Sequence, residues 1–121
     1  MDHQQAYNFV NSLAKVWVDC DLDALQRYDQ SFTADYYGEK VTYDDLVARL
    51  AHMKQHQQQR EMKVLDVISE SNKIAARMHY KANDKDDGNV DMEIAVIYHL
   101  NEHNKVIRAW AFANTKVNYR R

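Results

Sequence analysis

The spacing of the apolar residues changes along the chain, and this change constrains the fold more than any other feature of the sequence. In residues 2–19, apolar side chains recur three and four positions apart, which places them on one face of a helix. After residue 60, apolar and polar residues alternate in several long runs, as they do in strands with one covered face. The chain is therefore expected to be α+β, with helices in its first half and a sheet in its second.

Capping residues mark the starts of two further helices. The Asp21 carboxylate can accept hydrogen bonds from the free amides that follow it, so a short second helix is expected there. Thr42 followed by Asp45 resembles a capping box and predicts a third helix that ends near residue 57. Residues 31–38, which lie between these two helices, are expected to be extended.

Four strands are expected in the second half of the chain, and the residues between them indicate how they pair. The expected ranges are 61–70, 73–83, 90–101 and 105–117. Gly88 can adopt the left-handed conformation that ends a three-residue hairpin loop. Such a loop places Tyr80 opposite Ile94 and gathers the large apolar residues of both strands on one face.

The last hairpin is expected to turn immediately before residue 105, with Asn104 in the left-handed conformation. This loop places Val96 opposite Trp110 and Tyr98 opposite Arg108. The large apolar residues again fall on one face. The turn residues and the alternation therefore predict the same antiparallel meander.

The two faces of this meander carry different side chains. The face expected to pack on the helices carries Met78, Tyr80, Ile94, Val96, Tyr98, Trp110 and Phe112. The other face carries Arg77, His79, Lys81, Glu93, Ala95, Ile97, Ala109, Ala111 and Ala113. Small, apolar and oppositely charged residues together suit a second sheet pressed against this face, so a homodimer through it is expected. The alternative is an ordinary exposed face with small residues.

The order of these elements and two short segments resemble the nuclear transport factor 2-like superfamily. Residues 21–25, Asp-Leu-Asp-Ala-Leu, are similar to its turn into the second helix, and residues 104–110, Asn-Lys-Val-Ile-Arg-Ala-Trp, to its last hairpin. The chain looks most like the SnoaL-like branch, named for polyketide cyclases. The resemblance implies a cone-shaped α+β barrel, with N-terminal helices packed on a curved, mainly antiparallel sheet, in one domain spanning residues 1–121. It also implies a pocket between the helices and the concave sheet face, and dimerisation through the opposite face.

Polar residues on the expected inner face are the candidates for chemistry in such a pocket. Tyr98, Arg108 and Asn114 would polarise a carbonyl, and Asp35 or His52 would carry a proton. An arginine among tyrosines would suit a carboxylate or enolate on an aromatic ligand. The alternatives are that Arg108 pairs with an acidic neighbour at the rim and that Asp35 is a solvated loop residue.

Seven further residues are expected to line the pocket, although plain core packing is an alternative for those on the helices. They are Trp17, Tyr37, Met53, Met78, Tyr80, Trp110 and Phe112. The resemblance places Asn114 where SnoaL-like sequences often have an acidic residue, and an amide cannot serve as a carboxylate base. It also places Leu13 and Tyr37 near the catalytic tyrosine and aspartate of ketosteroid isomerases, which disfavours that chemistry.

Composition and motifs exclude several classes of function. Lys and Arg number 16 against 18 Asp and Glu, so nucleic-acid binding through a basic field is not expected. Neither a membrane span nor a secretory signal is visible and Cys20 is the single cysteine, so a cytoplasmic location is expected. His52 and His56 lie four residues apart, but the sequence offers no third zinc ligand at a suitable spacing. Neither a metal nor an organic cofactor is expected.

The sequence favours a protein that binds, and can transform, a small hydrophobic or aromatic molecule. As an enzyme it would be a cofactor-independent cyclase, isomerase or hydrolase that works by acid–base chemistry. The alternative is a non-catalytic homodimeric module that associates with a protein partner. A pocket with convergent polar groups favours the first hypothesis, whereas a cone filled by Trp17, Met78, Trp110 and Phe112 would contradict it.

Overall fold

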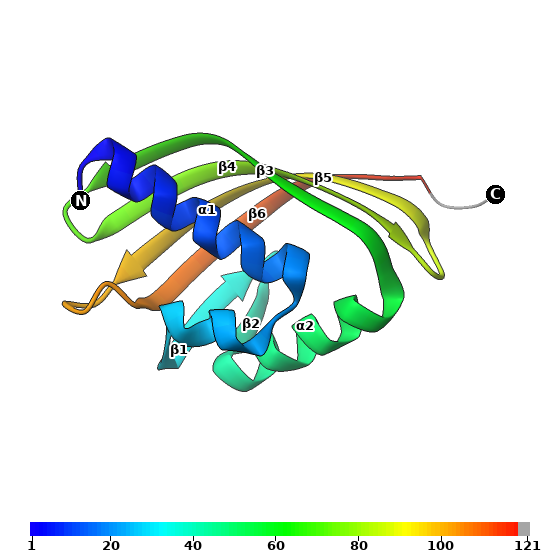
Figure 1. Ribbon diagram of the computed structural model, residues 1–121, viewed down its shortest axis with the longest axis horizontal. Helices are drawn as coiled ribbons and strands as arrows, with labels where there is room; N and C mark the ends of the chain where they lie inside the picture. Colours follow the sequence, from blue (N-terminus) through cyan, green and yellow to red (C-terminus); the bar gives the residue numbers. More distant parts are fainter. Residues whose placement is uncertain (119–121) are drawn as a thin grey trace.

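The computed structural model describes residues 1–118, and in this range the chain forms two α-helices, one 3₁₀-helix and six strands (Figure 1). In chain order they are α1 (His3–Asp19), η1 (Leu22–Arg27), β1 (Tyr28–Tyr36), β2 (Glu39–Thr42), α2 (Tyr43–His56), β3 (Gln57–Glu70), β4 (Lys73–Asp84), β5 (Gly88–Leu100) and β6 (Val106–Asn118). This order confirms the predicted α+β class. The short strand β2 is an addition to the prediction.

The helices begin at the capping residues that the sequence indicates. The Thr42 hydroxyl accepts a hydrogen bond from the Asp45 amide, and the Asp45 carboxylate accepts one from the Thr42 amide. The capping box at the start of α2 is thereby confirmed. Asp21 accepts a hydrogen bond from the Asp23 amide and caps η1, which is a 3₁₀-helix.

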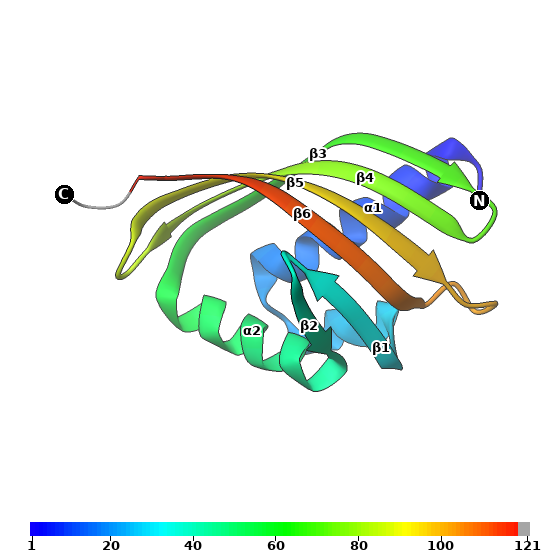
Figure 2. The same ribbon diagram turned by 180° about the vertical axis from the view of Figure 1, so that it is seen from behind.

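The six strands form one curved sheet in the order β2-β1-β6-β5-β4-β3 (Figure 2). β1 and β6 pair in parallel, and the other neighbouring strands pair antiparallel. The sheet is open, with β2 and β3 as its edges. Both α-helices lie on its concave side (Figure 1), which we call the inner face. The opposite, outer face carries no helix of the described range.

The hairpin between β4 and β5 differs slightly from the predicted register. Its three-residue loop begins one residue earlier than expected, so Tyr80 pairs with Met92 instead of Ile94. Gly88 and, in the next hairpin, Asn104 have the predicted positive φ, at 80° and 57°. A shift of the pairing by two residues keeps every side chain on its predicted face, because side chains alternate with a period of two.

The hairpin between β5 and β6 contains a bulge that sequence reasoning did not predict. Leu100 pairs with Val106, which fits the predicted register, but His99 pairs with Arg108. Ile107 is therefore an extra residue in β6 with no partner of its own in β5. A single extra residue reverses the face of every side chain that follows it.

Because of the bulge, the residues of β6 that were predicted on the inner face lie on the outer face, and those predicted on the outer face lie on the inner face. Ala109, Ala111 and Ala113 were expected on the outer, dimer-forming face, but they lie on the inner face opposite Tyr98, Val96 and Ile94, and the first two are buried. Four residues that were expected on the inner face lie on the outer face instead: Arg108, Trp110, Phe112 and Asn114. The other predicted outer-face residues of β4 and β5 do lie there; they are Arg77, His79, Lys81, Glu93, Ala95 and Ile97.

The core lies between the inner face and the helices. Its largest fully buried side chains include Leu13, Leu25, Phe32, Leu46 and Leu50. Arg60 of β3 connects the end of α1 to the sheet. Its guanidinium donates hydrogen bonds to the carbonyls of Val18 in α1 and of Gln57, which directly follows α2. The last carbonyls of a helix have no partner within the helix, so the bond to Val18 satisfies one of them at the end of α1.

We expect Gly88→Val to destabilise the fold by about 1–3 kcal/mol, because a β-branched residue is strained at positive φ. The measurement is the free energy of unfolding in urea. Gly88→Asn is the matched control, and its loss should be smaller because asparagine tolerates this conformation. Equal losses for the two variants would contradict the assignment of the cost to backbone strain.

Candidate ligand-binding site

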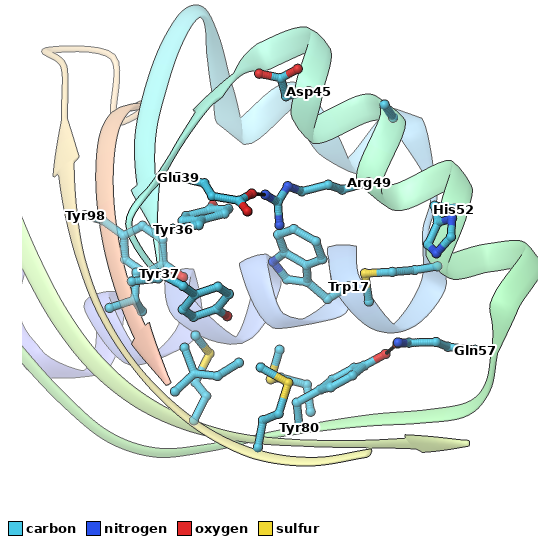
Figure 3. Close-up of a pocket in the computed structure, with 18 of the residues that line it drawn as sticks. Trp17, Tyr36, Tyr37, Glu39, Asp45, Arg49, His52, Gln57, Tyr80 and Tyr98 are labelled. Carbon is cyan, nitrogen blue, oxygen red and sulfur yellow. Dashed lines mark hydrogen bonds and ion pairs between the residues drawn. The ribbon is translucent and has the colours of Figure 1, made fainter. Parts of the chain in front are cut away.

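A cavity of about 590 Å³ lies between α2 and the inner face of the sheet (Figure 3). Its lining residues are Trp17, Tyr36, Tyr37, Glu39, Lys40, Asp45, Ala48, Arg49, His52, Met53, Gln57, Met62, Met78, Tyr80, Met92, Ile94, Val96, Tyr98 and Ala111. Cavities that hold small molecules commonly span roughly 300–1,000 Å³. The cavity on the inner face is therefore large enough for a small molecule, and it lies where the sequence analysis expected a pocket.

Sulfur and aromatic groups dominate the wall of this cavity. Met53, Met62, Met78 and Met92 all line it, together with the ring of Trp17. Methionine is flexible and polarisable, and its sulfur makes favourable contacts with aromatic rings. The wall can therefore adapt to the outline of a flat aromatic or other apolar ligand.

Three buried tyrosines supply hydrogen-bond donors at one side of the cavity. Tyr36 and Tyr98 line it, and Tyr28 is buried close to them. Burial raises the pKa of each phenol well above its ordinary value, and the neighbouring tyrosines raise it further. All three phenols are therefore protonated near neutral pH and can donate.

These hydroxyls are not satisfied by the protein. The fully buried Tyr28 hydroxyl has no hydrogen-bond partner of normal geometry in the described residues. The Trp17 side chain approaches this hydroxyl, and the weak contact offsets a small part of the rise in the Tyr28 pKa. Within residues 1–118, the Tyr36 and Tyr98 hydroxyls also lack a hydrogen-bond partner, and only burial and nearby charges shift their pKa values. An acceptor atom on a ligand would satisfy the two hydroxyls that line the cavity.

Tyr80 lies on another side of the cavity and is already paired (Figure 3). Its hydroxyl donates to Gln57 Oε1, and Gln57 Nε2 donates to the Asp84 carboxylate at 3.1 Å. Burial raises the pKa of the Tyr80 phenol as well. This chain of hydrogen bonds shapes the cavity, whereas the tyrosines at 36 and 98 remain available to a ligand.

Arg49 extends from α2 towards β2 across the cavity (Figure 3). Its Nη2 lies 3.0 Å from Glu39 Oε2, and its guanidinium carbon lies 5.8 Å from the centre of the Tyr36 ring. The positive charge opposes part of the rise in the pKa of Tyr36 and of Tyr37. Arg49 therefore provides a cation close to the phenol donors.

The predicted site residues fall into two groups. The residues that line the cavity are Trp17, Tyr37, His52, Met53, Met78, Tyr80 and Tyr98. The residues that lie away from it are Asp35, Arg108, Trp110, Phe112 and Asn114. Four residues of the second group belong to β6 and are displaced by the bulge at Ile107.

Asp35 and Arg108 have structural partners outside the cavity. The Asp35 carboxylate accepts a hydrogen bond from the Gly38 amide at 3.0 Å, which closes the turn between β1 and β2. The Arg108 guanidinium donates to the Thr33 hydroxyl at 3.0 Å and lies over the Trp110 ring. Thr33 thus takes the place of the acidic neighbour considered for Arg108.

Sequence reasoning missed Tyr36 and Arg49, although signals for both were present. Asp45, Ala48, Arg49, His52 and Met53 follow one another at spacings of three, one, three and one, which defines one side of α2. Tyr36 and Ala34 are two residues apart and both lie on the buried face of β1. The parallel pairing of β1 with β6, which brings Tyr36 to the cavity, left no signal in the local pattern.

The rings of His52 and His56 stack with centroids 4.0 Å apart. Within the described residues, no cluster of three or more His, Cys, Asp and Glu side chains has the arrangement of a metal site. No helix in the same range has the length and apolarity needed to cross a bilayer. His52 is thus an imidazole at the cavity with an aromatic neighbour.

Solved structures share this fold at low sequence identity. AclR from Streptomyces galilaeus, a proposed hydroxylase, matches with a TM-score of 0.79 and 13% identity, over 95% of this chain and 82% of that one. IdmH from Streptomyces antibioticus, a proposed polyketide cyclase, matches with a TM-score of 0.76 and 9% identity, over 91% and 92%. A proposed SnoaL-like polyketide cyclase from Jannaschia sp. CCS1 matches with a TM-score of 0.75 and 14% identity, over 93% and 87%. Neither a protein-family model nor a curated protein sequence matches the chain.

We expect stability to fall as the pH rises above the ordinary phenol pKa of 10.0. In the unfolded chain these tyrosines ionise there, whereas burial keeps them protonated in the folded state, so stability present below this pH is lost above it. Each buried phenol should contribute about 1.4 kcal/mol of loss per pH unit. The measurement is the urea unfolding free energy at a series of alkaline pH values. In Tyr28→Phe the unfolding free energy should decline less steeply with pH. An unchanged slope would contradict the assignment of this loss to the buried phenols.

Proposed function

Because the chain has the nuclear transport factor 2-like fold with a cavity on its inner face, we propose that it binds a small aromatic or hydrophobic molecule there. The observation that carries this proposal is the pair of hydroxyls of Tyr36 and Tyr98, which line an apolar cavity without partners among the described residues. A ligand oxygen that accepts from both would satisfy two donors at once. The names of the structural neighbours IdmH and the Jannaschia protein support a ligand of the polyketide kind.

The same groups can act on a bound carbonyl compound by acid–base chemistry. Tyr36 and Tyr98 would donate to the carbonyl oxygen and stabilise the enolate that forms when a proton leaves the adjacent carbon. His52 would accept that proton, because its imidazole lines the cavity and is a suitable general base. Isomerisation and cyclisation can both begin with such a step. In hydrolysis His52 would instead take a proton from water as the water attacks the carbonyl carbon, and the two phenols would donate to the oxyanion that forms. This assignment gives the proton-carrier role to His52 rather than to Asp35.

The outer face supports a second proposal, that the protein forms a homodimer. Ile97 pairs with Trp110 at the centre of this face, and Phe112 lies nearby with 64% of its surface exposed. Arg77 bridges Asp66 and Glu93 beside them. An apolar patch bordered by charged pairs is typical of a protein interface. This face also supports the alternative function of a non-catalytic association module.

Ligand binding is tested by a thermal-shift screen with aromatic acids, polyketide-like lactones and steroids. A ligand at about 100 times its Kd should raise the unfolding free energy by roughly 2.7 kcal/mol. For a compound that binds, Tyr98→Phe should weaken binding about threefold to tenfold, because one hydrogen bond is lost. Arg108→Ala is the control and should leave affinity unchanged, since Arg108 lies on the outer face. A screen that finds no stabilising compound would contradict the proposed ligand binding.

The dimer is tested by light scattering on the purified protein at tens of micromolar. We expect a dimer for the unchanged chain and a monomer for Phe112→Lys, because a charge placed in an apolar interface loses its hydration without a partner. Leu22→Lys is the matched control, since Leu22 is another exposed apolar residue, on η1, and this variant should stay dimeric. A monomeric wild-type protein would contradict the homodimer and leave the ligand proposal standing.

A further inference from the structure

Arg49 is placed in the cavity with most of its donors unused. Its ion pair with Glu39 runs through one nitrogen, Nη2, at 3.0 Å. A guanidinium carries five N–H donors, and Arg49 makes no other hydrogen bond within residues 1–118. The guanidinium carbon lies 5.8 Å from the centre of the Tyr36 ring, within reach of a cation–π contact. Figure 3 shows the group between Glu39 and Trp17, where a ligand would contact it.

The present partner of Arg49 is easily displaced. The Glu39 side chain is 76% exposed and the Arg49 side chain 36% exposed, so water screens their attraction. Exposed ion pairs of this kind contribute little to stability. A carboxylate that belongs to a ligand, and that is held in place by contacts deeper in the cavity, would therefore compete effectively with Glu39.

The charged residues that line the cavity are two cations, Lys40 and Arg49, and two carboxylates, Glu39 and Asp45. The Asp45 carboxylate is occupied by the capping box of α2, where hydrogen bonds from Thr42 lower its pKa. Lys40 also lines the cavity and forms no ion pair with any residue of the described range. A ligand oxyanion that takes the place of Glu39 at Arg49 would leave the Glu39 carboxylate in water at the exposed edge, and the oxyanion would contact the guanidinium close to the phenol donors.

We propose that the ligand carries an acidic group, a carboxylate or a comparable oxyanion, which binds Arg49 by replacing Glu39. This inference rests on the proposed binding function of the same cavity and specifies the chemical class of its ligand. Arg49 and the tyrosines at 36 and 98 would then hold two different oxygen-bearing groups of one molecule. The apolar wall of methionines would cover the aromatic part between them.

The test uses a matched pair of probes, anthraquinone-2-carboxylic acid and its primary amide. They have nearly the same shape and differ in charge near neutral pH, so their affinities report on the acidic group alone. Isothermal titration calorimetry should show that the unchanged protein prefers the acid by about tenfold or more, as expected for a charge-assisted bidentate contact.

Three variants separate the contribution of Arg49 from general effects. Arg49→Gln should weaken the acid about tenfold to a hundredfold and leave the amide within about twofold, because only the acid uses the guanidinium charge. Glu39→Gln should strengthen the acid about twofold to fivefold, since it removes the competing carboxylate. Arg27→Gln is the matched control, because Arg27 also lies over an aromatic ring but away from the cavity, and it should change neither affinity.

The outcomes distinguish this inference from the function on which it rests. Equal binding of acid and amide, unaffected by Arg49→Gln, would overturn the acidic ligand and leave the proposed binding function intact. Weakened acid binding in Glu39→Gln would also overturn it, because Glu39 would then assist the ligand instead of competing with it. Failure of both probes to bind, together with a screen that finds no ligand, would remove the binding function itself.

Discussion

The extra residue at Ile107 is the constraint on which the inner face of the sheet depends. Beyond this bulge, Ala109 and Ala111 face the helices, and Trp110 and Phe112 face outwards. Two large aromatic rings on the inner face would occupy the space that forms the cavity, whereas two methyl groups leave it open. The same register places those rings on the outer face, where they supply its apolar patch. The candidate ligand site and the candidate dimer surface are thus two consequences of one irregularity in strand pairing.

The cavity combines an apolar wall with donors that the protein leaves unpaired. A buried hydroxyl without a partner costs about 1–3 kcal/mol, so phenylalanine would suit a purely structural core better than tyrosine. The hydroxyls of Tyr36 and Tyr98 line the cavity without a partner among the described residues, so an acceptor on a ligand would satisfy them, whereas the buried Tyr28 hydroxyl lies outside the cavity lining. Arg49 adds a cation whose partner lies at the exposed edge of the site. Together these groups support the proposal of a ligand that carries hydrogen-bond acceptors.

Local signals in the sequence predicted the elements and many of the residues at the cavity. The Thr42–Asp45 capping box, the left-handed Gly88 and Asn104, and the alternation along β4 and β5 each follow from interactions within a few residues. The predicted fold was confirmed for this reason, and Trp17, His52 and Tyr98 do line the cavity. Arg108 and Asn114 were misplaced because a bulge leaves no mark on local periodicity. Arg49 was overlooked because the cavity side of α2 can be recognised only when the position of the sheet is known.

The sequence alone located the two α-helices and strands β4 to β6 to within a few residues and assigned the faces of β4 and β5, although it missed β2 and the first residues of β3. It did so because caps, tight turns and alternation are decided by neighbouring backbone groups and by the geometry of a single strand or helix. Only the tertiary structure decided which side of β6 faces the helices and which strand brings Tyr36 to the cavity. Those choices follow from the register between distant strands, where one inserted residue exchanges buried and exposed side chains. The packing of the whole sheet against α1 and α2 selects that register, and no short segment of the chain contains it.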